Sequence, residues 1–266
     1  MSKNPYLPEH AEIIDIKQET EVDYTYRLDI DLDVENGQFV EVSIPKVGEC
    51  PISVSDFGDD YIDLTIRHVG KVTNQIGDLE VGDKLGIRGP YGNGFPMDKY
   101  QGTDMVIAAG GTGLAPVKSI INHYYNNPAE VASLTLLLGF KSPDNILFRE
   151  EIKKWRAAEH IDVILTVDKG DKEWRGNKGL ITNFVDQVEF TNLDNMEVIV
   201  VGPPIMMKFT TQEFMKHDLT QEQIWVSFER KMSCGIGKCG HCKIDDTYVC
   251  VEGPVFNYPT AEKLID

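Results

Sequence analysis

Residues 105–116 read Met-Val-Ile-Ala-Ala-Gly-Gly-Thr-Gly-Leu-Ala-Pro, an apolar run that leads into a glycine-rich turn. The next segment, 117–127, has the apolar spacing of a helix. A strand, a glycine turn and a helix in this order can hold a phosphate, because glycines permit close approach and the first helical amides are free. The turn reads G-x-G-x-x-P, however, and Pro116 suits any first helical turn. Two interpretations therefore stay open, a nucleotide site and a simple tight turn.

Downstream of this turn, short apolar runs alternate with helix-like segments. This alternation indicates βαβ units and a parallel sheet. We expect strands at 133–140, 161–168, 197–204 and 224–230, and helices at 146–158, 179–188 and 204–217.

Upstream of the turn, the first hundred residues have an all-β pattern. Stretches rich in β-branched and aromatic residues recur between glycine-containing turns. Five or six strands at this spacing predict a small antiparallel barrel. The stretches lie at 11–18, 24–30, 38–44, 61–69 and 84–90.

The charge balance excludes two classes of partner. The 266 residues include 43 Asp and Glu against 26 Lys and Arg, a net charge of −17. A nucleic-acid binder needs a basic face, and so does a protein that docks on anionic lipid. The sequence shows neither a leader-like apolar segment nor a membrane span, so we expect a cytoplasmic protein without membrane insertion.

Four of the five cysteines fall within seventeen residues near the C-terminus. Their spacing, C-x4-C-x2-C-x7-C, begins as in plant-type [2Fe–2S] proteins, and the glycines between them permit a tight loop. A four-cysteine zinc site is the alternative, although zinc ribbons usually have two C-x2-C pairs. The expected ligands are Cys234, Cys239, Cys242 and Cys250, whereas Cys50 is too far upstream. Arg230, Lys231, Lys238 and Lys243 predict a basic collar around this site.

The barrel, the GGTGLAP turn and the four-cysteine loop, in this order, resemble the ferredoxin–NADP reductase superfamily. The resemblance covers nearly the whole chain. Residues 229–242 and 249–256 look closest to the electron-transfer subunit of anaerobic sulfite reductase and to sulfhydrogenase gamma subunits, and they are also similar to dihydroorotate dehydrogenase electron-transfer subunits. This resemblance implies an antiparallel FAD-binding β-barrel (1–100), a parallel-sheet NAD(P)H-binding domain (101–228) and a C-terminal [2Fe–2S] segment (229–266).

The resemblance also implies where FAD binds. The family's Arg-Pro-x-Ser stretch corresponds to residues 50–53, with Cys50 in place of the arginine that usually meets a flavin phosphate. A second stretch covers residues 66–73, where backbone amides and a hydroxyl would hold the pyrophosphate. The implied FAD residues are Pro51, Ile52, Ser53, Val54, Ile66, Arg67, His68, Gly70 and Thr73.

For NAD(P)H, the resemblance implies the glycine turn and a later Gly-Pro pair near the nicotinamide. Asp168 ends the third strand of this domain and can reach a ribose or simply form a turn. No arginine follows the second strand to bind a 2′-phosphate, which favours NADH over NADPH. The implied residues are Gly110, Gly111, Thr112, Gly113, Pro116, Asp168, Gly202 and Pro203.

Together these features predict an electron-transfer subunit that oxidises NAD(P)H through FAD and passes single electrons through a [2Fe–2S] cluster. No side-chain acid, base or nucleophile is expected to be catalytic, since the cofactors carry the chemistry. The expected partner is the catalytic subunit of a heteromeric redox complex, and the favoured complex is an anaerobic sulfite reductase. A dihydroorotate dehydrogenase or a sulfhydrogenase is the alternative partner. A non-catalytic iron–sulfur redox sensor is the alternative from another class.

Overall fold

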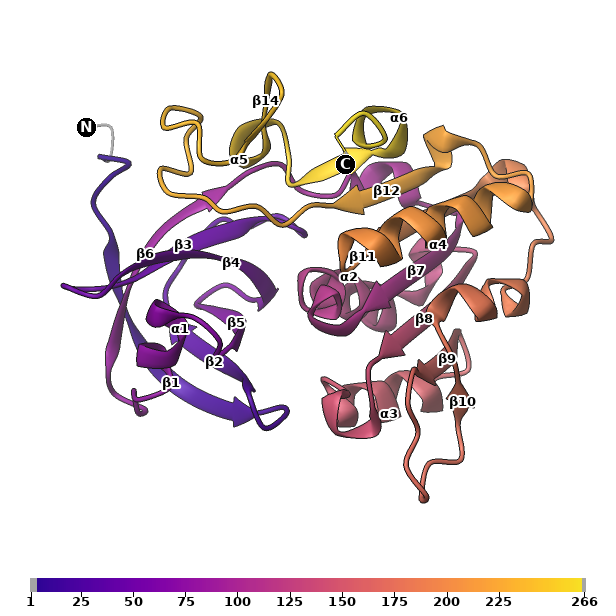
Figure 1. Cartoon of the computed structure of the whole chain (residues 1–266), viewed down its shortest axis with the longest axis horizontal. Helices are drawn as coiled ribbons and strands as arrows, with labels where there is room; N and C mark the ends of the chain where they lie inside the picture. Colours follow the sequence, from indigo (N-terminus) through magenta and orange to yellow (C-terminus); the bar gives the residue numbers. More distant parts are fainter. Residues whose placement is uncertain (1–3, 265–266) are drawn as a thin grey trace. The chain divides into compact units, whose positions relative to one another are not determined.

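The structure is a computed structural model that describes residues 4–264. It contains two compact units (Figure 1). The first contains residues up to Phe95 together with Glu229–Val255, and the second contains Pro96–Phe228 and the residues from Phe256 onward. The cysteine-bearing segment therefore belongs to the same unit as the N-terminal strands.

The N-terminal strands form a closed antiparallel barrel, as predicted. Around the barrel, the strands follow the order β1-β2-β5-β4-β3-β6. Val40 and Val42 point into the core, whereas Glu41 between them points to the outer face, as the two-residue repeat of a strand requires. The short helix α1 (Lys71–Ile76) adds Ile76 to the core. The strands are β1 (Glu9–Gln18), β2 (Asp23–Asp29), β3 (Phe39–Ile44), β4 (Gly48–Phe57), β5 (Tyr61–Arg67) and β6 (Lys84–Tyr91).

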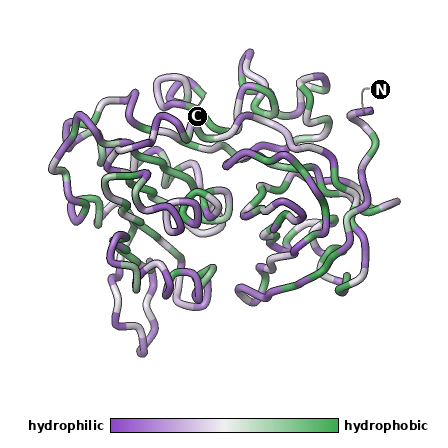
Figure 2. Tube along the Cα trace, turned by 180° about the vertical axis from the view of Figure 1, so that it is seen from behind, coloured by the Kyte–Doolittle hydropathy of each residue, from purple (hydrophilic) through white to green (hydrophobic). Residues whose placement is uncertain are grey.

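The second unit contains the predicted parallel sheet, with the order β10-β9-β8-β7-β11-β12-β15. Strands β7 (Asp104–Gly110) and β11 (Met196–Val201) lie near its middle and are almost entirely buried, as parallel strands covered on both faces are. Figure 2 shows hydrophobic stretches along the strands of both units. The other strands are β8 (Ser133–Phe140), β9 (Ile161–Val167), β10 (Asn177–Lys178), β12 (Ile224–Ser227) and β15 (Val255–Asn257).

Most of the predicted helices are present, with one correction. Residues 179–188, expected as an α-helix, instead form a 3₁₀ segment over Ile181–Gln187. The α-helices are α2 (Ala115–Asn126), α3 (Arg149–Ala157), α4 (Pro204–Lys216), α5 (Val249–Glu252) and α6 (Tyr258–Ala261). Each helix within residues 4–264 is too short or too polar to cross a membrane.

Candidate cofactor sites

The glycine turn lies where the sequence places it, between β7 and α2. Residues Gly111–Leu114 form a 3₁₀ turn, Gly111 has a φ of +57°, and Pro116 occupies the first turn of α2. A Cβ atom on Gly113 would lie 2.5 Å from the carbonyl oxygen of Val201 and 2.8 Å from the Cα of Gly202. The turn therefore packs against the end of β11 with no room for a side chain at Gly113.

The predicted Gly202-Pro203 pair lies beside this turn. Gly202 has a φ of +159° and follows β11 directly, and Pro203 is the N-cap of α4. A Cβ on Gly110 would collide with the sulfur of Met206, in the first turn of α4. The structure thus brings together the two glycine motifs from segments about ninety residues apart, with Met206 filling the space beside them.

Asp168 is exposed just beyond β9, at the carboxyl edge of the sheet. Its amide donates to the carbonyl oxygen of Phe140 at 2.9 Å, and the amide of Lys169 donates to that of Lys141 at 3.0 Å. Partial burial raises the pKa of Asp168, and Lys169 opposes that rise. Ligands of open parallel sheets bind outside the carboxyl ends of the strands, so Asp168 lies at the appropriate edge.

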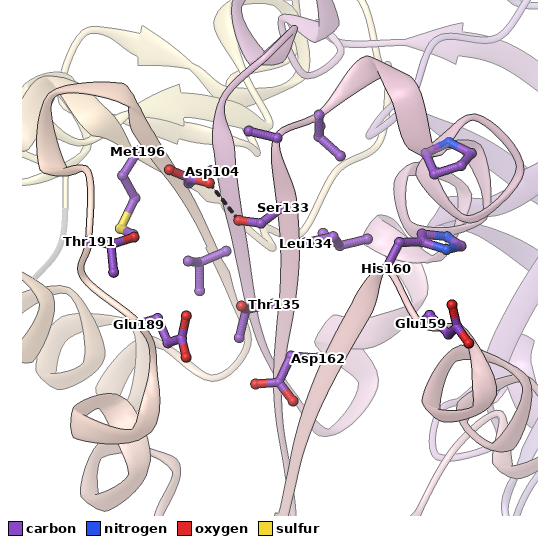
Figure 3. A pocket seen from close by; sticks show the side chains of 14 residues that line it. Asp104, Ser133, Leu134, Thr135, Glu159, His160, Asp162, Glu189, Thr191 and Met196 are labelled. Atoms are coloured by element: carbon purple, nitrogen blue, oxygen red, sulfur yellow. Dashed lines mark hydrogen bonds between the residues drawn. The ribbon is translucent and has the colours of Figure 1, made fainter.

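A cavity of about 390 Å³ lies at the opposite edge of this sheet, at the amino ends of its strands (Figure 3). Asp104 begins β7 and accepts a hydrogen bond of 2.7 Å from Ser133, which begins β8. The lining also includes Glu159, Asp162 and Glu189. Its acidic lining would repel a dinucleotide phosphate, and its edge is the wrong one for a nucleotide.

In the barrel, several of the implied FAD residues could contact a ligand mainly through their backbone atoms. Val54 and Ile66 are buried in the barrel core. Pro51, Ile52 and Ser53 lie along β4, paired with β3. The sequence pattern predicts no strand at β4, because Pro51 interrupts the stretch of strand-forming residues there.

The side chain of Arg67 is already engaged within the barrel. Its guanidinium makes a bidentate ion pair with the fully buried carboxylate of Asp23, at 2.8 and 3.1 Å. That hydrogen bonding raises the pKa of Arg67. Asp23 also accepts a hydrogen bond of 2.5 Å from Thr20. A flavin phosphate that bound Arg67 would have to share its guanidinium with the carboxylate of Asp23.

In the segment after β5, the side chain of Thr73 forms hydrogen bonds with the backbone. The hydroxyl of Thr73 accepts hydrogen bonds from the amides of Val69 and Gly70, at 3.2 and 2.9 Å. His68 stacks on Tyr24 with centroids 4.7 Å apart and bonds the hydroxyl of Tyr26 at 3.0 Å. Burial lowers the pKa of His68. Thr73 and His68 therefore shape this segment, and a pyrophosphate would compete with Thr73 for the two amides.

Cys234, Cys239 and Cys242 lie in a loop with three glycines of positive φ, and Cys250 lies in the short helix α5. The glycines are Gly235, Gly237 and Gly240. Backbone amides point at the sulfurs. Gly237 donates to the Sγ of Cys250 at 3.2 Å, and the amides of Lys238 and Cys239 each donate to the Sγ of Cys234 at 3.4 Å. Amide donors of this kind are typical of iron–sulfur sites.

The electrostatics couple Cys239 to Cys234, and Cys250 to both Cys242 and Cys234. The amide of His241 contributes most to lowering the pKa of Cys239, whereas burial raises that of Cys250 to about 12. Among residues 4–264, no three His, Cys, Asp or Glu side chains converge on one point suited to a single ion. Four cysteines can hold a two-iron cluster or a single zinc ion, and the C-x4-C-x2-C spacing is the feature that favours the cluster.

The fifth cysteine, Cys50, is a half-buried thiol in β4. Burial, together with the nearby carboxyls of Glu41 and Glu49, raises its pKa to about 12. Cys50 lies in a barrel strand, outside the segment that carries the other four cysteines. That it is not a cluster ligand stays a prediction.

Glu41 is fully buried on the outer face of β3, and neither of its carboxylate oxygens has a hydrogen-bond partner. Burial raises its pKa from 4.5 to about 8; Glu49 and Cys234 add to the rise and Arg88 opposes it. Glu41 is therefore a neutral acid at pH 7.

Glu41→Gln is expected to change how stability depends on pH. Below pH 4.5 the carboxyl is protonated in both the folded and the unfolded chain. Between pH 4.5 and 8 it ionises only in the unfolded chain, so the wild type loses stability as the pH rises. The Gln variant escapes this loss, and its free energy of unfolding should gain about 3 kcal/mol on the wild type between pH 5 and pH 8. Urea denaturation at both pH values measures this gain, with Glu21→Gln at an exposed site as the control. Equal pH dependence in all three proteins would refute it.

Two family models match separate parts of the chain. The oxidoreductase NAD-binding domain matches residues 107–212, which contain both glycine motifs. The iron-sulfur cluster binding domain of dihydroorotate dehydrogenase B matches residues 229–261, which contain the four clustered cysteines.

Curated relatives match nearly the full length. The chain is 37% identical to sulfhydrogenase 1 subunit gamma of Pyrococcus furiosus, over 84% of this chain and 78% of that protein. It is 36% identical to sulfhydrogenase 2 subunit gamma of the same organism, over 96% of each. A probable dihydroorotate dehydrogenase B (NAD(+)) electron transfer subunit of Pyrococcus horikoshii is 34% identical, over 91% of this chain and 85% of that protein.

Solved structures share the fold at lower identity. The NADH-dependent reduced ferredoxin-NADP oxidoreductase of flavin-based electron bifurcation superposes with a TM-score of 0.73 at 24% identity, over 96% of this chain and 92% of that one. The CS-b5R domains of human Ncb5or give a TM-score of 0.74 at 21% identity, over 82% and 68%. The expected ferredoxin reductase fold, a barrel followed by a parallel sheet, is confirmed.

Proposed function

Because the chain belongs to the family of oxidoreductase electron-transfer subunits that includes those of sulfhydrogenase (gamma) and of dihydroorotate dehydrogenase B, we propose that it oxidises NADH through FAD and a [2Fe–2S] cluster. When bound, FAD accepts a hydride and the cluster carries single electrons. The chain's own residues bind, orient and shield these groups. We assign FAD to residues 1–100, NADH to 101–228 and the cluster to 229–266.

The backbone amides that donate to cysteine sulfurs are the observation that carries this proposal. Gly237 donates to the sulfur of Cys250, and Lys238 and Cys239 donate to that of Cys234, as is typical of iron–sulfur sites. For NADH, the support is the glycine turn between β7 and α2, which Gly113 lets close on the end of β11. For FAD, the support is the barrel of the reductase fold and the stretches 50–54 and 66–73.

Elemental analysis of protein purified without oxygen tests the cluster. The proposal expects about two irons and two acid-labile sulfides per chain, together with bound flavin. One zinc per chain and no labile sulfide would contradict it.

We further propose that the chain works in a cytoplasmic heteromer with a catalytic partner. The catalytic subunit of an anaerobic sulfite reductase is the partner that we favour. The curated relatives bear the names of sulfhydrogenase and dihydroorotate dehydrogenase subunits, which are the alternatives. Affinity purification from native extract, with the partner identified by mass spectrometry, distinguishes the three. A catalytic sulfite-reducing subunit supports the first assignment, and either of the other subunits replaces it.

The predicted basic collar is weaker than the sequence suggests, because Lys243 is paired with Asp246 at 2.9 Å. Lys238 is exposed beside Cys239. Lys238→Glu should slow association with the partner about tenfold at low ionic strength, and salt should remove the difference. Lys243→Glu is the matched control and should have a smaller effect. Stopped-flow association rates at two salt concentrations measure both, and equal rates for all three proteins would mean that the collar is only solvated surface.

A further inference from the structure

Arg88, on strand β6, connects the barrel to the start of the cysteine loop. Its guanidinium donates to the backbone carbonyl oxygen of Ser233 at 3.0 Å and to that of the first cysteine, Cys234, at 3.1 Å. It also donates to the hydroxyl of Tyr91 at 2.8 Å and to the carbonyl of Pro5 at 3.1 Å. One side chain thus binds the N-terminal segment, the barrel and the loop.

Glu49 fixes the orientation of this guanidinium. Its carboxylate accepts two hydrogen bonds from Arg88, at 2.8 and 2.5 Å. With these bonds every N–H of the guanidinium has an acceptor, a pattern that a lysine ammonium cannot reproduce. Arg88 is only 6% exposed, so water cannot replace a lost partner easily.

The loop is fitted to the barrel on both sides of the cysteines. A Cβ on Gly235 would lie 2.6 Å from the ring of Tyr91, so the loop backbone rests on that ring next to Cys234. At the other end, the side-chain amide of Asn93 donates to the carbonyls of Glu252 and Val255, at 3.0 Å each. Arg88 is the charged member of these contacts and the one that reaches the backbone of a predicted ligand.

We propose that Arg88, oriented by Glu49, is a positioning residue that sets the place of Cys234 in the cluster site. The proposal rests on the proposed function, since it assumes that the loop holds a cluster. Two hydrogen bonds from a charged donor fix the peptide groups on either side of the Cys234 Cα, and with them the direction of its Cβ and sulfur. The same positive charge lies close to the site and is balanced by Glu49.

Four variants of the full chain test this role. Arg88→Gln removes both the guanidinium and its charge. Arg88→Lys keeps the positive charge but loses the guanidinium hydrogen bonds. Glu49→Gln keeps the guanidinium but removes the negative charge that faces it. The double variant R88Q/E49Q removes both charges, so that folding does not fail because of an unpaired carboxylate. Arg27→Gln is the matched control, since Arg27 makes a similar bidentate pair with Asp63 in the barrel, at 2.7 and 2.9 Å.

Three readouts follow the cluster rather than turnover: the rate of iron release to a chelator, the EPR line shape of the reduced protein and the midpoint potential. Arg88→Gln and R88Q/E49Q should release iron at least about tenfold faster and change the line shape. Arg88→Lys should rescue the potential but not the line shape. Glu49→Gln should raise the potential while keeping the line shape closer to that of the wild type.

Arg27→Gln should behave as the wild type in all three measurements. Iron release and line shape that are equal in the wild type and both Arg88→Gln variants would overturn the proposal. A wild-type chain that holds zinc would refute the proposed function instead, and zinc release from the same variants would still test the positioning of Cys234.

Discussion

Cys242→Ser is expected to abolish the cluster while leaving NADH oxidation with a flavin-level acceptor such as ferricyanide. Cys242 is buried, and a serine hydroxyl is a much poorer ligand for cluster iron than a thiolate. Even groups that only support a metal ligand are worth 10- to 100-fold in metal affinity, so loss of the ligand itself should cost more than about 100-fold. Iron content and the cluster absorption measure the loss.

Cys50→Ala is the matched control for this substitution. It removes the half-buried cysteine of β4, which lies outside the segment that carries the other four. The control should keep its iron. The proposed ligand set would be wrong if Cys242→Ser kept a full cluster, or if Cys50→Ala lost it.

Gly113→Ala is expected to raise the KM for NADH by about 10- to 100-fold. The new methyl group would lie 2.5 Å from the Val201 carbonyl oxygen, so the glycine turn must move away from the end of β11. A displacement of about 1 Å at a binding site costs up to about 100-fold. Steady-state kinetics with ferricyanide, with direct titration of NAD binding, measures the effect.

Gly111→Ala separates crowding from backbone strain. Gly111 has a φ of +57°, but a Cβ there meets no atom within 4 Å. This variant should lose about 1 kcal/mol of stability and bind NADH better than Gly113→Ala. Equal losses of NADH affinity in the two variants would mean that contact with β11 does not shape the site.

The sequence predicted the architecture well because its signals are local. The strand, glycine turn and helix around Gly111 follow from the order of residues alone, and so does the alternation that builds the barrel. The failures arose where tertiary contacts decide. Residues 181–187 form a 3₁₀ segment although their pattern is helical, and β4 contains a proline that masked it as a strand.

The sequence predicted which residues form the candidate sites, but not the contacts that these residues make. Spacing identified the four cysteines, yet not the backbone amides that donate to the sulfurs of Cys234 and Cys250. The resemblance implied Arg67 as an FAD residue, but not that its guanidinium pairs with Asp23, 44 positions away in the sequence. Arg88 and Glu49 carried no signal at all, because their contacts join segments that only the fold brings together.

The most direct test of the central claim is an anaerobic titration of the purified chain with NADH, followed by absorption and EPR spectroscopy. We expect NADH to bleach the flavin bands and then to produce the EPR signal of a reduced [2Fe–2S] cluster without any partner present. A protein whose flavin and cluster both stay oxidised under excess NADH, or one that contains neither group, would contradict it.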